Sequence, residues 1–221
     1  MTNADEIERL NSREPVALPW TKVMLDKVFA SVALVLTLPL SIIIVLAIVV
    51  MGLVFRRDAG SVMHYEIRVS AGEQFRLPKF RIFTREAVAE IERGMIPKQV
   101  ENVPGNLTAV GRVLKKTGLD ELPQFWTVLK GDMSLIGPRP KPVAEYEPEI
   151  EQGIWRREVI RAGLSGSAQL LKGTERTAED DLLADLRYIE RVRCEGAWSV
   201  LALDMGFLWD TVRLMFKMTG E

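Results

Sequence analysis

Residues 119–146 read LDELPQFWTVLKGDMSLIGPRPKPVAEY, and the pattern within this run decides the local fold. Its apolar residues recur at helical spacing, which predicts a short amphipathic helix that begins near Asp120 and ends before Gly131, a favourable C-terminal cap. Asp120 can cap the free amides of the first turn, and Pro123 is tolerated there because those amides have no partner within the helix. The apolar positions are Leu122, Phe125, Trp126 and Leu129.

The acidic start of this predicted helix is the strongest chemical signal in the chain. Asp120, Glu121 and Gln124 lie about one helical turn apart or less and away from the apolar positions, so they form one polar cluster. Two neighbouring carboxylates resist ionising together unless a cation neutralises them, and Mg²⁺ prefers oxygen ligands from carboxylates and substrate phosphates. We therefore expect Asp120 and Glu121 to hold Mg²⁺ and one carboxylate to attack phosphorus. The alternative is an acidic helix start without chemistry.

A second signal is Arg139, which stands between Pro138 and Pro140 in the Gly137-Pro138-Arg139-Pro140 segment. A proline restricts the residue before it to extended backbone, so this segment is expected to be rigid. A guanidinium held in this way can make paired hydrogen bonds to phosphate oxygens. The alternative is an arginine that is simply solvated.

The run from Leu119 to Tyr146 resembles the core of the bacterial initiating sugar transferases, the monotopic phosphoglycosyl transferases. Upstream, Lys79-Phe80-Arg81 is similar to the Lys-Phe-Arg segment of that family. Downstream, the segment RAGLSGSAQ, from Arg161 to Gln169, resembles its Arg-Pro-Gly-Ile-Thr-Gly-x-x-Gln segment. A hydrophobic segment with a central proline, from Val28 to Phe55, completes the order, so the resemblance covers most of the chain.

The resemblance implies a reaction. The family transfers a sugar phosphate from a nucleoside diphosphate sugar, here expected to be a UDP-sugar, to polyprenyl phosphate and releases the nucleoside monophosphate. This is the first membrane step of surface polysaccharide or glycoconjugate synthesis. Asp120 falls on the family's nucleophile, which forms a covalent aspartyl phosphosugar intermediate, and Glu121 falls on its partner at the Mg²⁺ site. The expected substrate-binding positions are Arg139, Pro138, Gln124, Lys115, Lys79, Arg81 and Gln169.

Several positions depart from the family pattern. Lys115 stands where the family usually has an arginine, which keeps the charge but loses the planar fork. Ala162 replaces a proline, and Leu38 replaces the serine before the membrane proline. None of these changes touches the acidic pair, so we expect the reaction to be retained.

The composition suits a membrane-bound enzyme with one catalytic domain. The chain has 221 residues, about the length of one domain, and its formal net charge of -1 argues against nucleic acid as a partner. The single cysteine, Cys194, excludes an internal disulfide, and the single histidine, His64, excludes a histidine-based triad or a multi-histidine zinc site. A homo-oligomer is compatible with the sequence.

The segment from Val28 to Phe55 carries no charge and predicts a membrane helix. A straight helix of this length would measure about 42 Å, against about 30 Å of hydrocarbon. Lysines precede the segment and arginines follow it, so the positive-inside rule gives neither end a clear claim to the outside. Pro39 near the middle removes an amide donor, which predicts a bent, re-entrant helix that enters and leaves by the same face. The alternative is a tilted or kinked helix that crosses the bilayer once.

The remaining chain predicts an α+β domain. Alternating apolar residues in the segment 63–69 and a turn at Ala71-Gly72 predict a hairpin, while 84–93 predicts a helix and 97–106 a loop. The stretch from Trp198 to Phe216 predicts an apolar helix that either lies in the membrane interface or packs in the core.

We therefore expect a leader at residues 1–20, a re-entrant (proline-broken) membrane helix at 21–57, and a small, mixed, helix-rich catalytic domain with interfacial helices at 58–221. The whole would be a monotopic protein of the bacterial inner membrane, with its catalytic domain on the cytoplasmic face and the lipid bilayer as a partner. The functional alternative is a non-catalytic, membrane-anchored scaffold of the same fold, which the presence of Asp120, Glu121 and Arg139 disfavours. A Rossmann-like glycosyltransferase is weaker still, because no strand is followed by a glycine-rich turn and a helix.

Overall fold

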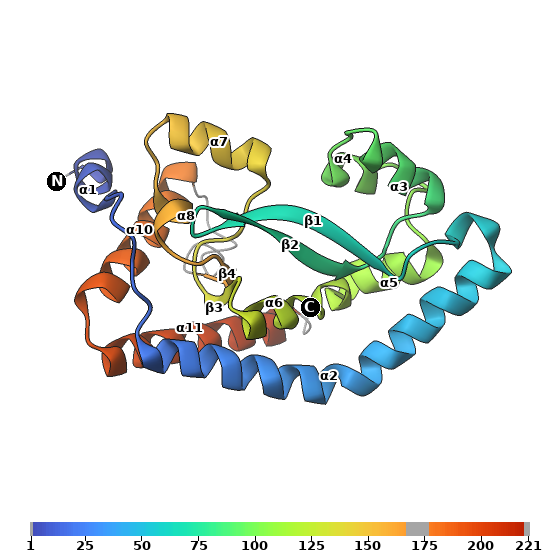
Figure 1. Ribbon diagram of the computed structural model, residues 1–221, viewed down its shortest axis with the longest axis horizontal. Coiled ribbons are helices and arrows are strands. Elements are labelled where there is room, and N and C mark those ends of the chain that lie inside the picture. Colours follow the sequence, from blue (N-terminus) through green and yellow to red (C-terminus); the bar gives the residue numbers. More distant parts are fainter. Residues whose placement is uncertain (1, 167–176, 219–221) are drawn as a thin grey trace. The chain divides into compact units, whose positions relative to one another are not determined.

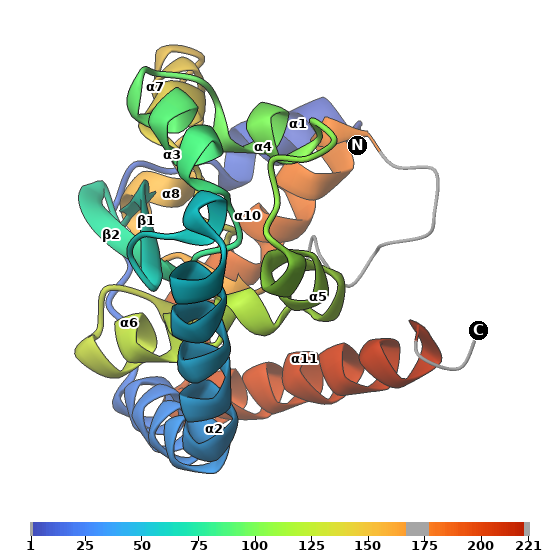
Figure 2. The ribbon, with the colours of Figure 1, turned by 90° about the vertical axis from the view of Figure 1, so that its right-hand side faces the viewer.

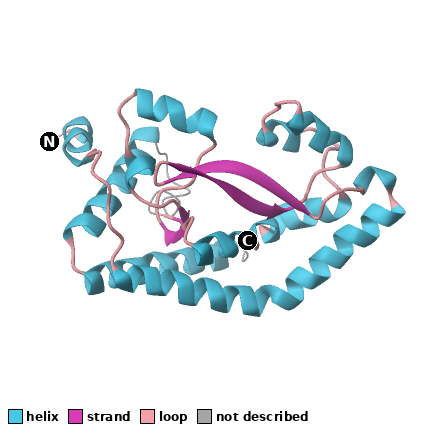
Figure 3. Cartoon of the chain, in the orientation of Figure 1, coloured by secondary structure: helices cyan, strands magenta, loops and turns pink. Residues whose placement is uncertain are grey.

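Helices dominate the computed structural model, which describes residues 2–166 and 177–218 (Figure 3). The chain forms two compact units. The first unit comprises Met1–Ser31, Ile67–Arg76 and Thr127–Glu221, and the second comprises Val32–Glu66 and Leu77–Trp126. The predicted class, a mixed and helix-rich α+β protein, is confirmed (Figure 1). The predicted division at residues 20 and 57 stays a prediction.

The helix α2 (Trp20–Val54) is the described helix that is long and apolar enough to cross a membrane. It begins well before the uncharged segment at Val28, so its first turns contain Lys22 and Asp26. Pro39 lies inside the helix without ending it. Because Pro39 has no amide hydrogen, the carbonyl of Val35 lacks its usual helical donor. The hydroxyl of Thr37 does not replace that donor, because it bonds the carbonyl of Ala33 at 2.7 Å.

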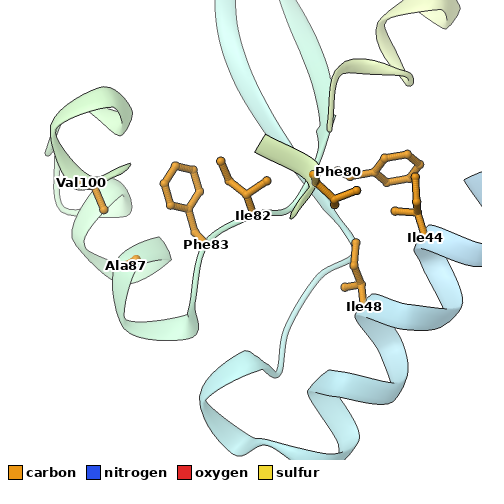
Figure 4. Close-up of a cluster of buried hydrophobic side chains, with 8 residues drawn as sticks. Ile44, Ile48, Phe80, Ile82, Phe83, Ala87 and Val100 are labelled. Atoms are coloured by element: carbon orange, nitrogen blue, oxygen red, sulfur yellow. The ribbon is translucent and has the colours of Figure 1, made fainter. Parts of the chain in front are cut away.

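A buried apolar cluster forms the core of the second unit (Figure 4). Ile44 and Ile48 of α2 contribute to it, together with Phe80 at the end of β2. The cluster continues through residues of the segments that follow β2: Ile82, Phe83, Ala87, Val100 and Leu114. The part of α2 that belongs to this unit, Val32 to Val54, is thus partly covered by protein, although most of its large apolar side chains remain exposed.

The predicted hairpin is present, with strands β1 (Met63–Ser70) and β2 (Glu73–Phe80) joined at Ala71-Gly72. The face assignment implied by the alternation was wrong for part of β1. Tyr65 and Ile67 are exposed, whereas the polar residues that alternate with them, His64, Glu66 and Arg68, are half-buried. His64 packs edge-to-face against Phe83, and burial lowers the pKa of its imidazole.

The second unit also contains several short helices and turns. Thr84 caps the predicted helix α3 (Arg85–Glu92), and η1 spans Arg56–Asp58. The expected loop at 97–106 instead begins with α4 (Pro97–Glu101), because a proline is favourable in a first helical turn. The other two elements are α5 (Ala109–Thr117) and η2 (Leu119–Glu121).

The helix predicted from residue 120 starts later than expected. Leu119 to Glu121 form the 3₁₀ turn η2, and the α-helix α6 (Gln124–Lys130) starts only after Pro123. Asp120 therefore does not cap an α-helix. Gly118 has a φ of 70°, the left-handed conformation that ends α5, and the acidic pair lies in the short link between α5 and α6.

The first unit is built on α10 (Ala178–Cys194) and α11 (Ala197–Met218), its two long helices beyond α2 (Figure 2). Two short parallel strands, β3 (Ser134–Ile136) and β4 (Gly163–Ser165), pair with Ser134 opposite Gly163. Its other described helices are α1 (Asn3–Leu10), α7 (Val143–Glu151) and α8 (Arg156–Val159).

The helix α11 carries a largely exposed face. Trp198, Met205 and Trp209 are exposed on it, while Val200 and Asp204 are buried. Trp198 packs edge-to-face against Trp20 at the start of α2, with ring centroids 5.7 Å apart. The helix buries one side against its own unit and leaves an aromatic side open, so α11 is not a fully buried core helix.

Candidate active site

The acidic turn of η2 places two adjacent carboxylates in different environments. Asp120 is 2% exposed, while Glu121 is half-buried. Burial raises the pKa of Asp120 above that of an ordinary aspartate, the neighbouring Glu121 raises it further, and Lys115 and Lys79 oppose the rise. Two adjacent like charges resist ionising together, and the two lysines offset this only in part.

Lys79, at the end of β2, supplies a cation to this turn. Its Nζ lies 3.6 Å from Oε1 of Glu121 and 3.1 Å from Oε1 of Glu66 on β1. The lysine thereby bridges a strand and the acidic turn. Sequence reasoning missed Glu66, although its place on the strand that pairs with β2 was a usable signal.

Tight backbone packing explains why the segment that follows Lys79 lies beside α5. The amide of Thr108, the cap of α5, donates to the carbonyl of Ile82 at 2.9 Å. Gly111 faces the same carbonyl so closely that a Cβ there would lie 2.1 Å from its oxygen. Only glycine permits this approach, which brings the end of β2 and the end of α5 to the same acidic turn.

The other predicted residues of the second unit differ in their surroundings. Lys115 is exposed, pairs with Glu101 at 3.2 Å, and acts on Asp120 through its charge. Gln124 is buried as the first residue of α6. Arg81 is also buried, and its guanidinium donates to the backbone carbonyls of Asp58 and Ala59. Its predicted contact with substrate stays a prediction beside this structural role.

The second unit contains an apolar pocket of about 530 Å³, and the two residues that follow the acidic pair in sequence help to line it. Leu122 and Pro123 line one part of it, and Phe80 and Met63 line another. The remaining wall comes from α2, through Leu34, Val35, Leu38, Ser41, Ile42, Val45 and Leu46. Sequence analysis did not predict this pocket, because its wall is assembled from segments far apart in the chain.

The acidic pair fits a magnesium ion as part of a larger ligand set. Within residues 2–166 and 177–218, no group of three or more histidine, cysteine, aspartate or glutamate side chains is arranged to hold a metal. Mg²⁺ commonly takes only one or two protein carboxylates and completes its shell with water and substrate phosphates. Asp120 and Glu121 supply hard oxygens, and a cation bound to them would offset the burial and the like charge that raise the pKa of Asp120.

Arg139 and Pro138 belong to the first unit, in the loop Gly137-Pro138-Arg139-Pro140 after β3. Both prolines are buried, whereas Arg139 is exposed. The loop backbone is held by hydrogen bonds: the amide of Gly137 donates to the carbonyl of Ser165 at 3.0 Å, and the carbonyl of Pro138 accepts from the amide of Gly163 at 2.9 Å. An exposed guanidinium on a fixed backbone suits the predicted anion contact, which stays a prediction. Gln169 lies outside the described residues.

Comparisons with known proteins agree with these features. A family model described as bacterial sugar transferase matches residues 18–218 of the chain. The chain is 35% identical over 195 residues to the UDP-N-acetylgalactosamine-undecaprenyl-phosphate N-acetylgalactosaminephosphotransferase of Aeromonas hydrophila, which covers 85% of this chain and 43% of that protein. It is 32% identical over 199 residues to the UDP-glucose:undecaprenyl-phosphate glucose-1-phosphate transferase of Klebsiella pneumoniae, which covers 85% of this chain and 38% of that protein.

A third relative is closer in length. The exopolysaccharide production protein ExoY of Rhizobium meliloti is 32% identical over 202 residues, covering 85% of this chain and 81% of that protein. The chain thus spans less than half the length of the Aeromonas and Klebsiella proteins and about four fifths of ExoY.

Proposed function

The chain belongs to the bacterial sugar transferase family, and we propose that it transfers a sugar phosphate from a UDP-sugar to polyprenyl phosphate with release of UMP. The observation that carries this proposal is the acidic turn. A buried carboxylate, Asp120, lies beside a second carboxylate and is influenced by the charges of two lysines. The residues that follow this acidic pair in sequence line an apolar pocket. This arrangement provides a nucleophile, charge for a diphosphate and a place for an isoprenoid chain.

The proposed reaction has two displacements at one phosphorus atom. In the first, a carboxylate oxygen of Asp120 attacks the phosphorus that bears the sugar, the bond to the bridging oxygen breaks, and UMP leaves with that electron pair. An aspartyl phosphosugar ester remains on the enzyme. In the second, an oxygen of polyprenyl phosphate attacks the same phosphorus, the bond to Asp120 breaks, and the carboxylate is regenerated. No oxidant or other reactant is needed.

Charged residues of each unit are proposed to bind and neutralise the substrates. Asp120 and Glu121 would hold Mg²⁺ together with substrate phosphate oxygens, and the ion would neutralise the charge of the diphosphate. Lys79 and Lys115 supply further positive charge at the acidic turn. Arg139 is proposed to bind a phosphate group through paired hydrogen bonds.

The apolar pocket is proposed to take the first isoprene units of polyprenyl phosphate. Leu122 and Pro123 line it directly after the acidic pair, so a chain lying there would bring its phosphate toward Asp120. Its other wall belongs to α2, which would also reach into the lipid. Burying an isoprenoid against these side chains would be favourable in proportion to the apolar area covered.

We also propose a re-entrant α2 in the bacterial inner membrane, with the catalytic residues on the cytoplasmic face. The uncharged segment is longer than a simple span needs, Pro39 lies within it, and both flanks are basic. The exposed tryptophans of α11 and Trp20 suit the polar boundary of a bilayer. If the chain is instead a catalytically inactive scaffold, it should release no nucleoside monophosphate from any nucleotide sugar.

Purified protein, a panel of nucleotide sugars and polyprenyl phosphate would test the reaction. With nucleotide sugar alone, about one equivalent of nucleoside monophosphate per active site should appear, and turnover should follow when lipid is added. A strict need for lipid before any release would instead indicate direct transfer in a ternary complex. No release with any sugar or lipid would contradict the enzyme assignment and favour the scaffold.

A further inference from the structure

The exposed guanidinium of Arg139 stands on a loop whose first carbonyl is held by a buried polar cluster. We propose that Lys22, Tyr188 and Asp204 are positioning residues that fix the Gly137-Pro138-Arg139-Pro140 loop. The inference rests on the proposed function, because the fixed loop would hold Arg139 in position to bind a substrate phosphate. All the residues involved belong to the first unit.

The ammonium group of Lys22 is the centre of this cluster. Its Nζ donates to the carbonyl of Ile136 at 3.1 Å and to Oδ2 of Asp204 at 2.7 Å, and both charged side chains are fully buried. The hydroxyl of Tyr188 lies 2.9 Å from Oδ1 of Asp204 and 3.2 Å from the same Ile136 carbonyl. Ile136 is the residue that immediately precedes Gly137, so the cluster acts on the first peptide of the loop.

The start of α2 holds β3 at two neighbouring residues. Lys22 and Asp26 are four residues apart and therefore lie on one side of the helix. Asp26 accepts a hydrogen bond at Oδ1 from the amide of Leu135 at 3.0 Å, while Lys22 binds the carbonyl of Ile136. A helix that binds an amide and a carbonyl of successive residues restrains both the position and the orientation of that strand.

The far end of the loop is held by a separate ionic cluster. Nε of Arg157 donates to the carbonyl of Arg139 at 2.7 Å, and the same guanidinium pairs with Glu149. Arg156 also pairs with Glu149 at 2.7 Å. Charged groups thus fix the carbonyls at both ends of the loop, while the amide of Gly163 holds Pro138 between them.

General energetics argue that the Lys22–Asp204 pair is not there for stability alone. Taking two charges out of water costs several kcal/mol each, and apolar replacements of buried pairs are often neutral or stabilising. What an apolar pair could not supply is the donor to the carbonyl of Ile136, which would then lie buried without its main partner. The cluster is therefore better explained by the geometry that it imposes on the loop.

Tyr188→Phe tests the inference, because it removes only the hydroxyl beside Ile136 and keeps the ring that packs against Phe207. Tyr146→Phe is the matched control, since its hydroxyl bonds the side chain of Glu158 and not a residue of the loop. Amide hydrogen exchange of the segment 134–141 should be about five- to tenfold faster in Tyr188→Phe than in wild type and unchanged in Tyr146→Phe. Equal exchange in all three proteins would overturn the inference, whether or not the protein is an enzyme.

A double-mutant cycle with Arg139→Ala separates positioning from general destabilisation. Tyr188→Phe should lower kcat/KM about tenfold, mainly through KM for the nucleotide sugar, and change it by less than about twofold when Arg139 is already alanine. Equal losses in the two backgrounds would show that the cluster does not act through Arg139. A wild-type protein without activity would refute the proposed function but leave the exchange test intact.

A paired variant keeps the test valid if Tyr188→Phe fails to fold. Lys22→Met with Asp204→Leu removes both buried charges together, so neither is left uncompensated. It should show the same faster exchange at 134–141 with a folded far-ultraviolet spectrum. Wild-type exchange in this folded double variant would overturn the inference.

Discussion

Nζ of Lys79 lies 3.6 Å from Oε1 of Glu121, so the end of β2 places a cation against the acidic turn. The same ammonium is closer to Glu66, at 3.1 Å. Its charge is therefore shared between carboxylates from two elements and neutralises neither fully. Burial, the largest cause, and the charge of Glu121 raise the pKa of Asp120, and Lys115 and Lys79 oppose that rise only in part.

Asp120→Asn is expected to abolish transfer while keeping the fold. An amide cannot accept the phosphosugar, so release of nucleoside monophosphate should fall by at least about a thousandfold. A carboxyl with a raised folded-state pKa destabilises the protein as the pH rises through that pKa, so a neutral amide should leave Tm at pH 7 unchanged or higher. Asp132→Asn, which alters a half-buried carboxylate paired with Lys130, should behave like wild type. Near-normal turnover in Asp120→Asn would remove the nucleophile assignment.

The pH dependence of the first half-reaction should report Asp120. The ionised form attacks phosphorus, so activity is lost as the pH falls through its pKa. At low Mg²⁺ concentration the acidic limb should lie above the range of an ordinary aspartate, and saturating Mg²⁺ should move the limb to lower pH. Lys115→Met removes a charge that lowers this pKa and should move the limb to higher pH. Lys116→Met removes the charge of the next lysine of α5. The charge of Lys116 is not among those that lower the pKa of Asp120, so this variant should leave the limb in place. Identical profiles in both variants would contradict the electrostatic role of Lys115.

Removal of divalent metal tests the predicted magnesium. If Mg²⁺ links the acidic pair to the diphosphate, EDTA should stop release of nucleoside monophosphate, and added Mg²⁺ should restore it. Glu121→Gln should reduce turnover by about a hundredfold or more and raise the Mg²⁺ concentration needed for half-maximal activity. Full activity in chelator would exclude the metal from the reaction.

Local patterns predicted the elements of the second unit better than their exact faces and starts. Alternation and a glycine turn identified the hairpin, but they do not say which side of a strand the protein covers. In β1 the covered side includes His64, which meets Phe83, and Glu66, which meets Lys79, so Tyr65 and Ile67 are left exposed. The pairing of the hairpin strands could have indicated Glu66 beside Lys79, whereas Phe83 lies beyond the end of β2 and no local pattern records its contact with His64.

The acidic motif itself was predicted, and its backbone was not. Helical spacing suggested an α-helix from Asp120, yet the left-handed Gly118 and the missing amide of Pro123 confine residues 119–121 to a 3₁₀ turn. Likewise, sequence reasoning identified Arg139 but not the buried Lys22–Asp204 pair behind its loop. A lysine near the start of a membrane helix suggests a topological signal, and only the tertiary structure shows it bound to Ile136.

Gly111→Ala is expected to destabilise the second unit strongly. A methyl group there would lie 2.1 Å from the carbonyl oxygen of Ile82, so α5 or the segment after Lys79 must move. Overpacking of this kind costs about 1 to 3 kcal/mol or more, which is a Tm loss of about 2–4 °C for each kcal/mol at this chain length. Gly206→Ala, in α11, meets no atom within 4 Å and should be neutral or slightly stabilising. Equal Tm values for the two variants would refute the close packing at Gly111.

The last prediction concerns the topology of α2. In the proposed reaction, the candidate catalytic residues after Arg56 meet nucleotide sugars on the cytoplasmic side, so the side on which the amino terminus lies distinguishes a re-entrant helix from a spanning one. In a Cys194→Ser background, a cysteine in place of Ser12 should resist a membrane-impermeant thiol reagent in intact cells and react after permeabilisation. Labelling from outside would show a spanning helix. Pro39→Ala restores an amide donor to the carbonyl of Val35 and removes the ring's clash, so it should move part of the population to the spanning form and make the cysteine at position 12 reactive. If the proline variant resists labelling as wild type does, the basic flanks rather than Pro39 hold the topology.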